Sequence, residues 1–337
     1  MTIHMNLGES SYDIIVERGS LNSVSESIDL NRKVLIVTDS GVPKQYAQTV
    51  ASKAKDARIE TIPQGEASKN FDMYRHLLKI LVEEGFTRTD CVVAVGGGVT
   101  GDLSGFVAAS YMRGIDFYNI PTTVLSQIDS SIGGKVAIDF EGFKNIVGAF
   151  YQPKKVIIDP DVLKTLPKRQ IANGLAEAVK MALTSDEELF ELFEKANPED
   201  CIDEIIVRSL NIKKYVVEQD EKEAGLRKIL NFGHTIGHGI ESEQGGRLYH
   251  GECVALGMIP MCGPKVRKRL IRVLEKTGLP STVNVCREKV FDALKHDKKF
   301  KGDKVTVIKV NEVGSFVMEE VYEEDVLRLL DEIDREK

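Results

Sequence analysis

The stretch CVVAVGGGVTGDLSGFVAASYMRG, residues 91–114, indicates the fold of the N-terminal half of the chain. Its consecutive apolar residues, 92–95, are typical of a strand buried inside a parallel sheet. Gly96, Gly98 and Gly101 follow with G-x-G-x-x-G spacing, where a strand would turn into a helix. Glycines let the main chain approach a ligand there, and free N–H groups at a helix start bind phosphate oxygens. The pattern predicts a nucleotide-binding turn, with a tight turn that binds no ligand as the alternative.

Two details separate this turn from an ordinary dinucleotide-binding fingerprint. It follows a later strand, because a buried strand is already expected in KVLIVTDSGV. The strand after it, DFYNIPTT, ends in Thr122 and Thr123 and not in an acidic residue. Strands and helices alternate over residues 30–150, which predicts a parallel α/β layer with a Rossmann-like site in a different arrangement. The polar residues expected at neighbouring strand ends are Asp39, Glu66 and Lys69.

A segment rich in glycine and small polar residues, 124–160, contains groups suited to an anion. Lys135, Lys144 and Asn145 lie near a Gly-Gly pair, with Asp129 just before it. Two lysines and an amide suit phosphate above all other anions. A solvated loop with ordinary surface lysines is the alternative, but the apolar neighbours of these residues disfavour it.

Half of the six histidines fall within RKILNFGHTIGHGIESEQGGRLYHG, residues 227–251. His234 and His238 are four residues apart and would share a helix face, so their spacing suggests that they bind a metal jointly. His250 follows a Gly-Gly break and belongs to another element. Imidazole is the commonest metal ligand in proteins. The alternative is two histidines facing water and a third in a loop.

Glu177 lies among apolar residues in GLAEAVK, with Lys180 three residues later on the same helix face. Such a carboxylate either faces solvent or is held by a cation, and the spacing leaves both open. If His234 and His250 bind a metal, Glu177 is the most plausible third ligand. Two imidazoles and one carboxylate with an open position form a catalytic zinc pattern.

Composition excludes several functional classes. The chain has 337 residues, 42% of them hydrophobic, and a net charge of −7, which argues against nucleic-acid binding. It has neither a long uncharged apolar run nor the features of a signal peptide at its start. The five cysteines form no CxxC pair, so we expect a cytoplasmic protein with reduced thiols. The sequence pattern becomes mainly helical after residue 160, which predicts two domains, 1–160 and 161–337. A lysine-rich loop and a hairpin-like strand pair precede a final amphipathic helix.

The motifs together resemble the 3-dehydroquinate synthase family of sugar phosphate cyclases. The family's signatures occur in order between about residues 33 and 310: VGGGVTGDLSGFVAASYMRG, IPTTVLSQIDSSIGGKVAI, KNIVGAFYQP, LKTLP, GLAEAVK, LNFGHTIGH and YHGECVALGM. The resemblance implies an α/β Rossmann-like N-terminal domain that binds NAD. It also implies an all-α C-terminal domain that binds zinc or cobalt, and a homodimer.

The resemblance also implies roles for single residues. The metal ligands would be Glu177, His234 and His250, which replaces the pair suggested by spacing and turns His238 toward substrate. Arg113 would reach the substrate phosphate of the neighbouring subunit. NAD would be held by Asp39, Gly65, Glu66, Lys69, Gly98, Val99, Thr100, Gly101, Asp102, Thr122, Thr123, Lys144 and Thr165. Substrate would be held by Asp129, Lys135, Asn145, Lys180, Lys213, Arg227, Asn231, His238 and one lysine of the DKK motif, Lys298.

The implied reaction converts 3-deoxy-D-arabino-heptulosonate 7-phosphate into 3-dehydroquinate and phosphate, a step of aromatic amino-acid biosynthesis by the shikimate pathway. It proceeds by transient oxidation with NAD, phosphate elimination, re-reduction, ring opening and aldol closure, so it causes no net redox change. Related cyclases that act on sugar phosphates without a carboxylate are one alternative. A metal-dependent polyol dehydrogenase is a second, and a non-catalytic NAD-binding module is a third.

Overall fold

The computed structural model describes residues 1–295, 300–301 and 304–333. The chain divides into two compact units, Met1–Pro167 and Lys168–Lys337, and each is described by itself. Among the described residues, no helix has the length and apolar character needed to cross a membrane.

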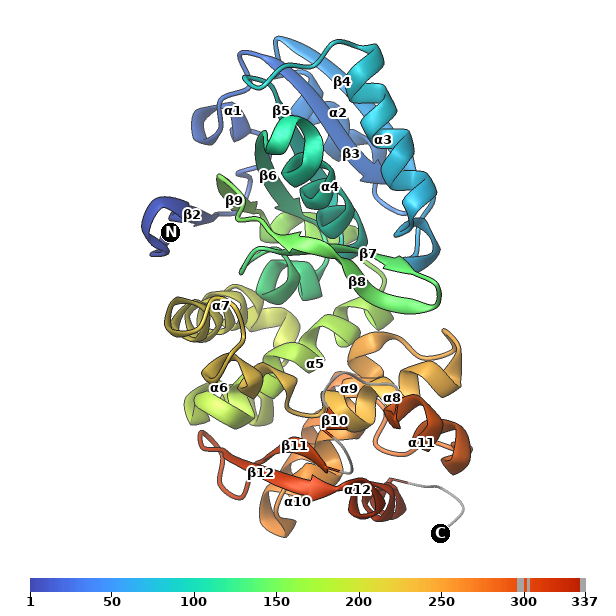
Figure 1. Ribbon diagram of the computed structural model, residues 1–337. Helices are drawn as coiled ribbons and strands as arrows, with labels where there is room; N and C mark the ends of the chain where they lie inside the picture. Colours follow the sequence, from blue (N-terminus) through green and yellow to red (C-terminus); the bar gives the residue numbers. More distant parts are fainter. Residues whose placement is uncertain (296–299, 302–303, 334–337) are drawn as a thin grey trace. The chain divides into compact units, whose positions relative to one another are not determined.

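The first unit is built on a seven-stranded sheet with the order β1-β2-β9-β6-β5-β3-β4 (Figure 1). Every neighbouring pair is parallel except β1 and β2, which form an antiparallel edge. The strands are β1 Thr2–Met5, β2 Tyr12–Val16, β3 Lys33–Asp39, β4 Asp56–Ile62, β5 Cys91–Gly96, β6 Asp116–Pro121 and β9 Lys155–Ile158. The helices are η1 Gly8–Ser10, α1 Val24–Ser27, α2 Lys44–Ala51, η2 Glu66–Ser68, α3 Phe71–Glu83, α4 Gly98–Ser110, η3 Tyr111–Arg113, the π-turn η4 Ser126–Ser130 and η5 Pro160–Thr165.

Helices cover both faces of this sheet, which explains the continuous apolar runs in its strands. Successive side chains of a strand point to opposite faces. Leu35 and Val37 therefore pack in one core with α3 and α4, whereas Val34 and Ile36 pack in the other with α1 and α2. With both faces covered, the whole of β5 is buried.

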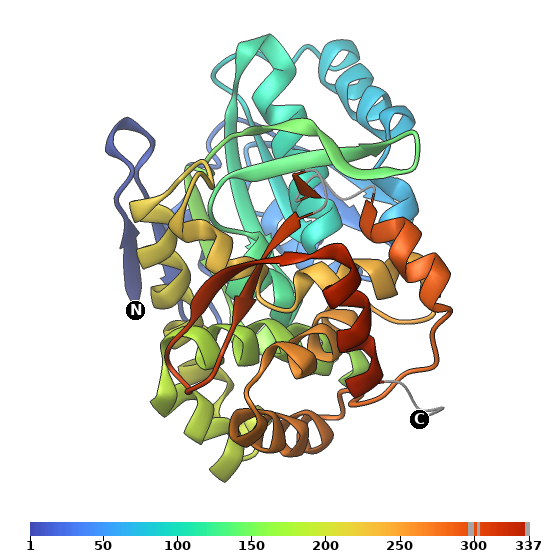
Figure 2. The same ribbon diagram turned by 60° about the horizontal axis from the view of Figure 1, so that its bottom comes forward.

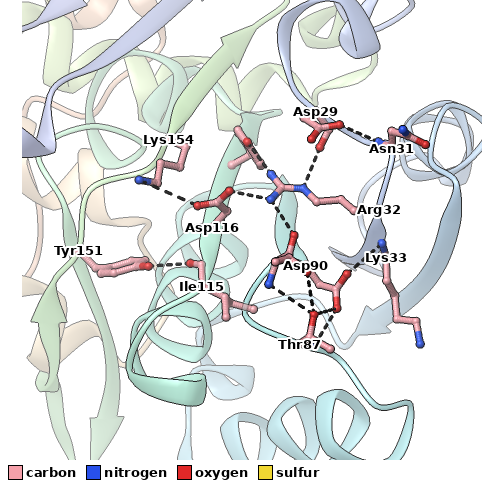
Figure 3. Close-up of polar contacts among 12 residues, drawn as sticks. Asp29, Asn31, Arg32, Lys33, Thr87, Asp90, Ile115, Asp116, Tyr151 and Lys154 are labelled. Atoms are coloured by element: carbon pink, nitrogen blue, oxygen red, sulfur yellow. Dashed lines mark hydrogen bonds and ion pairs between the residues drawn. The ribbon is translucent and has the colours of Figure 1, made fainter.

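A polar network closes the amino ends of three central strands (Figure 3). The guanidinium of Arg32, just before β3, donates to Asp116 Oδ2 at 2.7 Å and to the Tyr118 hydroxyl at 2.7 Å, both on β6. Asp90, just before β5, accepts from the main-chain N–H of Lys33 at 3.2 Å and from that of Thr87 at 2.6 Å. The network ties β3, β5 and β6 to one another through hydrogen bonds within the chain.

The segment expected to bind an anion forms a hairpin of β7 Lys135–Phe140 and β8 Phe143–Phe150. The π-turn η4 immediately precedes it. A single turn of π-helix, such as η4, is rare and often occurs at a functional site.

The second unit is helical apart from one small antiparallel sheet, β10-β11-β12. Figure 2 shows its hairpin of β11 and β12 leading into α12. The strands are β10 Phe300–Lys301, β11 Lys304–Lys309 and β12 Val317–Tyr322. The helices are α5 Lys168–Ser185, α6 Glu187–Lys195, η6 Pro198–Cys201, α7 Ile202–Gln219, η7 Leu226–Asn231, α8 His234–Gln244, α9 His250–Met258, η8 Ile259–Met261, α10 Pro264–Thr277, α11 Arg287–Lys295, α12 Glu323–Leu329 and η9 Leu330–Glu332. The hairpin agrees with the strand pair expected near the C-terminus.

Candidate active site

The carboxyl edge of the first unit's sheet collects the residues expected to hold NAD. Thr122 follows β6 and donates its main-chain N–H to the carbonyl of Gly96 at 2.9 Å, which places the threonine pair against the glycine turn. A Cβ added to Gly97 would lie 3.2 Å from the Thr123 methyl group. Gly97 is the N-cap of α4 and gives it no side-chain cap. The first-turn N–H groups of α4 are therefore oriented for an anionic ligand at the edge where open α/β sheets bind ligands.

Two polar contacts tie this edge together. The Thr100 hydroxyl on α4 donates to Asp39 Oδ2, at the end of β3, at 3.1 Å. The buried ammonium of Lys69 donates to Asp102 Oδ2 at 2.6 Å and makes a short contact with Asn145 Oδ1 on β8. Lys69 thus joins a residue expected to bind NAD to one expected to bind substrate.

The charges around Lys69 shift its pKa and that of Glu66. Burial alone would lower the pKa of Lys69, but the carboxylates of Asp102 and Glu66 raise it above its ordinary value. Burial raises the pKa of Glu66, and the nearby Lys69 and Lys144 oppose that shift. Lys69 therefore remains charged at neutral pH, with a carboxylate already bound to it.

The other residues expected in the first unit are more dispersed. Asp129 lies in the π-turn η4, whose Ser130 hydroxyl would be 3.0 Å from a Cβ on Gly98. Thr165 contacts the Tyr46 hydroxyl of α2 at 3.0 Å. Arg113 is exposed in η3, which follows α4, and α4 itself rises about 18 Å from Gly98 to Ser110. The remaining members, Gly65, Val99, Gly101 and Lys135, lie before η2, in the first turn of α4 and at the start of β7.

A compact group of metal-binding side chains lies in the second unit. Glu177 on α5, His234 on α8 and His250 on α9 have ligand atoms within 4.8 Å of one another. Glu177 Oε1 lies 3.7 Å from His234 Nε2 and 3.6 Å from His250 Nε2. Both oxygens of Glu177 are buried without a hydrogen bond of good geometry, although the Lys180 ammonium makes a short ion-pair contact with Oε2. A buried carboxylate beside two imidazole nitrogens suits a divalent cation.

His238 does not join this group, contrary to what spacing alone suggested. Its ring centre lies 5.3 Å from that of His234, but the ligand atoms that lie close to Glu177 belong to His234 and His250. It shares a second possible group with Glu241 and His250, in which Glu241 Oε2 lies 3.0 Å from His250 Nδ1.

Strong coupling of charges marks the Glu177 group. Burial would raise the pKa of Glu177, but Lys180 and His250 lower it far below its ordinary value. Burial would lower the pKa of His250, but Glu177 and Glu241 raise it to about 10. Without a metal, His250 therefore carries a proton that a metal ion must displace.

Close packing of glycine brings the three ligand-bearing helices together. A Cβ on Gly251 would lie 1.9 Å from the Asn173 carbonyl oxygen of α5, and one on Gly257 would lie 2.0 Å from the Gly233 carbonyl oxygen. Any larger residue would push α9 away from α5 or from the start of α8. The start of α9 is further held by Arg169, which makes two hydrogen bonds to Glu252, at 2.7 and 2.8 Å.

Cationic and amide side chains expected to bind substrate occur in the same unit. Lys180, Lys213 and Arg227 are all buried. The main-chain N–H of Arg227 donates to Asp220 Oδ2 at 2.9 Å, and the Asn231 amide donates to Glu223 at 2.7 Å. Lys298 lies outside the described residues.

Family models match residues 59–300, and known proteins match nearly the whole chain. The models for the N-terminal and C-terminal parts of 3-dehydroquinate synthase match residues 59–173 and 174–300. The 3-dehydroquinate synthase of Streptococcus suis (strain 05ZYH33) is 40% identical, over 98% of this chain and 99% of its own length. The chain belongs to the 3-dehydroquinate synthase family.

Solved structures of related cyclases agree with this family membership. A 2-deoxy-scyllo-inosose synthase with carbaglucose-6-phosphate, NAD+ and Co2+ has a TM-score of 0.90 and 26% identity, over 98% of this chain and 99% of its own. A 2-epi-5-epi-valiolone synthase of Streptomyces hygroscopicus subsp. jinggangensis 5008, with NAD+ and Zn2+, has a TM-score of 0.86 and 26% identity, over 96% and 97%. These neighbours confirm the expected fold class, a Rossmann-like α/β part and a helical C-terminal part.

Sequence reasoning about this member of the 3-dehydroquinate synthase family missed several residues that hold His250 and the start of α9 in place. Glu241, Glu252, Arg169 and Asn173 are among them. Glu241 had a readable signal, because positions 234, 238 and 241 share one face of a helix. Arg169 and Asn173 act from another helix, so no local spacing reveals them.

Proposed function

We propose that this chain converts 3-deoxy-D-arabino-heptulosonate 7-phosphate into 3-dehydroquinate and phosphate, as a lyase that needs NAD and one divalent metal ion. The single observation that carries the proposal is the set of Glu177, His234 and His250, in which the buried Glu177 has Lys180 beside it. The 40% identity to a 3-dehydroquinate synthase over nearly the full length supports the same reaction.

The residues present fit both cofactors. Two imidazoles and a carboxylate form a donor set for zinc or cobalt, the metals named for the two structural neighbours. The uncapped start of α4, the Thr122–Thr123 pair and Asp39 would hold NAD at the carboxyl edge of the sheet.

The chain's own groups would bind and orient the substrate. When bound, NAD supplies hydride transfer and the metal supplies Lewis acidity. In the second unit, the buried Arg227 and Lys213 suit the substrate carboxylate. In the first unit, Lys135 and Asn145 suit the phosphate. Each set suits one of the two anionic groups of the substrate, and such contacts would bind and orient it for elimination and ring closure.

Product analysis tests the proposal. Purified protein with NAD and Co2+ or Zn2+ should release phosphate from the heptulosonate and accumulate no NADH, and a chelator should stop the release. Turnover of sedoheptulose 7-phosphate or glucose 6-phosphate in place of the heptulosonate would favour a related cyclase. Accumulation of NADH from a polyol would instead favour a dehydrogenase.

We further propose that the protein acts as a homodimer in which Arg113 completes the neighbour's site. Arg113 is exposed at the end of α4 distant from Gly98, and the large apolar residues Met112, Phe140 and Phe143 are also exposed in this unit. Phe140 and Phe143 pair across the hairpin of β7 and β8, so exposed apolar residues lie together on this unit, which supports an interface there.

Subunit mixing tests this arrangement. Arg113→Ala and Glu177→Gln should each be nearly inactive alone. After exchange of subunits, each mixed dimer would have one site that combines an intact metal group with an intact Arg113. An equal mixture, in which about half of the dimers are mixed, should therefore recover about one quarter of wild-type activity. Equal activity of the mixture and of the separate variants would argue against a shared site, and sedimentation would report the oligomeric state.

A further inference from the structure

We infer that Glu241 is a positioning residue, which orients His250 so that its Nε2 atom faces the metal. The inference rests on the proposed function, because it takes Glu177, His234 and His250 as the metal ligands. It adds a residue to which the family signatures quoted above give no role.

The contacts of the His250 ring define the role of Glu241. Glu241 Oε2 lies 3.0 Å from Nδ1, and Glu177 Oε1 lies 3.6 Å from Nε2. A carboxylate accepts hydrogen bonds, so Nδ1 carries the hydrogen and donates it to Glu241. In the metal-bound protein this leaves the lone pair on Nε2, the nitrogen that faces Glu177.

His234 provides an internal comparison. Its Nδ1 lies 3.1 Å from the main-chain carbonyl oxygen of Phe232, and its Nε2 also faces Glu177. Both histidines therefore have Nδ1 fixed by an acceptor and Nε2 directed to the same carboxylate. The acceptor is a neutral main-chain group in one case and a charged side chain in the other.

This difference matters because His250 is held less firmly by packing. Its side chain is 34% exposed, against 11% for His234. The ring of His250 consequently depends more on its hydrogen bond, and a carboxylate partner also makes an imidazole a stronger ligand.

Glu241 could instead be a ligand itself, in a group with His238 and His250. That arrangement would use His250 Nδ1 for the metal, and it would leave the buried Glu177 without a cation other than Lys180. The geometry favours the positioning role, and the two roles predict different spectra.

The experiment compares the wild-type protein with Glu241→Gln, Glu241→Ala and the control Glu243→Gln. Glu243 lies on the same helix and contacts Gln244 and Arg247. Co2+ affinity is measured by competition with a chelator, coordination by the visible absorption of bound Co2+, and folding by thermal unfolding without metal.

We expect Glu241→Ala to weaken Co2+ binding about 10- to 100-fold, as loss of an outer-shell partner does elsewhere. Glu241→Gln should recover part of this loss, because its amide oxygen still accepts from Nδ1. One ion should bind per chain, with a spectrum of the same coordination number, and Glu243→Gln should match wild type.

Two outcomes would overturn the inference. Equal Co2+ affinity of Glu241→Ala and wild type would show that the contact does not position the ligand. A changed coordination number would show that Glu241 is itself a ligand. Failure of the wild-type protein to bind Co2+ would instead contradict the proposed function.

Discussion

The carboxyl edge of the first unit and the metal group of the second hold their groups in different ways. The edge relies on main-chain N–H groups at the start of α4, and its charged side chains, such as Lys69 and Asp102, already bind each other. In the metal group, three side chains from three helices converge on one point. Cofactor binding at the edge should therefore be sensitive to a bulkier residue near the main chain. Metal binding should be sensitive to the loss of a single side chain.

The largest expected effect comes from Glu177→Gln, which removes the negative charge from the centre of the metal group. Metal binding and phosphate release should both fall by more than about a hundredfold, because even outer-shell partners are worth about 10- to 100-fold. NAD affinity should stay unchanged. Metal analysis, NAD titration and phosphate release check this, with the partly exposed Glu191→Gln on α6 as control. Retention of stoichiometric metal would contradict the assignment.

Acidity should also separate the two sites. The pKa of His250 without metal is raised to about 10, so protons compete with the metal throughout the neutral range. Raising the pH removes the competing proton from solution. Co2+ affinity should therefore rise about tenfold per pH unit between about pH 6 and 8. A histidine of ordinary pKa, about 6.5, would level off above pH 7. Chelator competition at several pH values distinguishes these outcomes.

A substitution at the glycine turn tests the opposite sensitivity. Gly98→Val should weaken NAD binding about 10- to 100-fold, or about 1.4–2.8 kcal/mol, because its side chain would crowd Ser130 and the first-turn N–H groups. Co2+ affinity should not change. NAD titration measures the effect, and Ala109→Val, near the other end of the same helix, is the matched control. Unaltered NAD affinity would remove the turn from the cofactor site.

The smallest effect on either site is expected from Arg32→Ala, at the amino ends of the strands. It removes the contacts with Asp116 and Tyr118 and should lower the free energy of unfolding by about 1–3 kcal/mol. Binding of NAD and Co2+ should remain at wild-type levels. Denaturant unfolding measures the change, with the more exposed Arg58→Ala as control. A loss of NAD affinity would mean that the two ends of the sheet are coupled.

Local patterns account for what the sequence could predict. The apolar run 92–95 and the glycines after it predicted a buried strand and a helix start, and the structure has both in β5 and α4. The i,i+4 spacing of His234 and His238 correctly indicated a helix, but the structure groups His234 with Glu177 and His250, because helical spacing says nothing about a third group from another helix. The sequence suggested Glu177 as a third ligand only on the condition that His234 and His250 bind a metal, and the family resemblance assigned all three. Glu241 and Arg169 escaped notice because their roles depend on contacts between elements.

Gly251 limits how far the helix that carries His250 can move relative to the helix that carries Glu177. It directly follows a proposed ligand, and an added methyl group would need more than 1 Å of clearance from the Asn173 carbonyl, which lies 1.9 Å from that position. Metal–ligand bonds accept deviations of only about 0.2 Å. The smallest possible enlargement at this position therefore exceeds what the coordination bonds can absorb. The absence of a side chain at Gly251 thus sets the distance between α9 and α5, and with it the size of the metal site. A substitution at this glycine would change the metal preference although every ligand is kept.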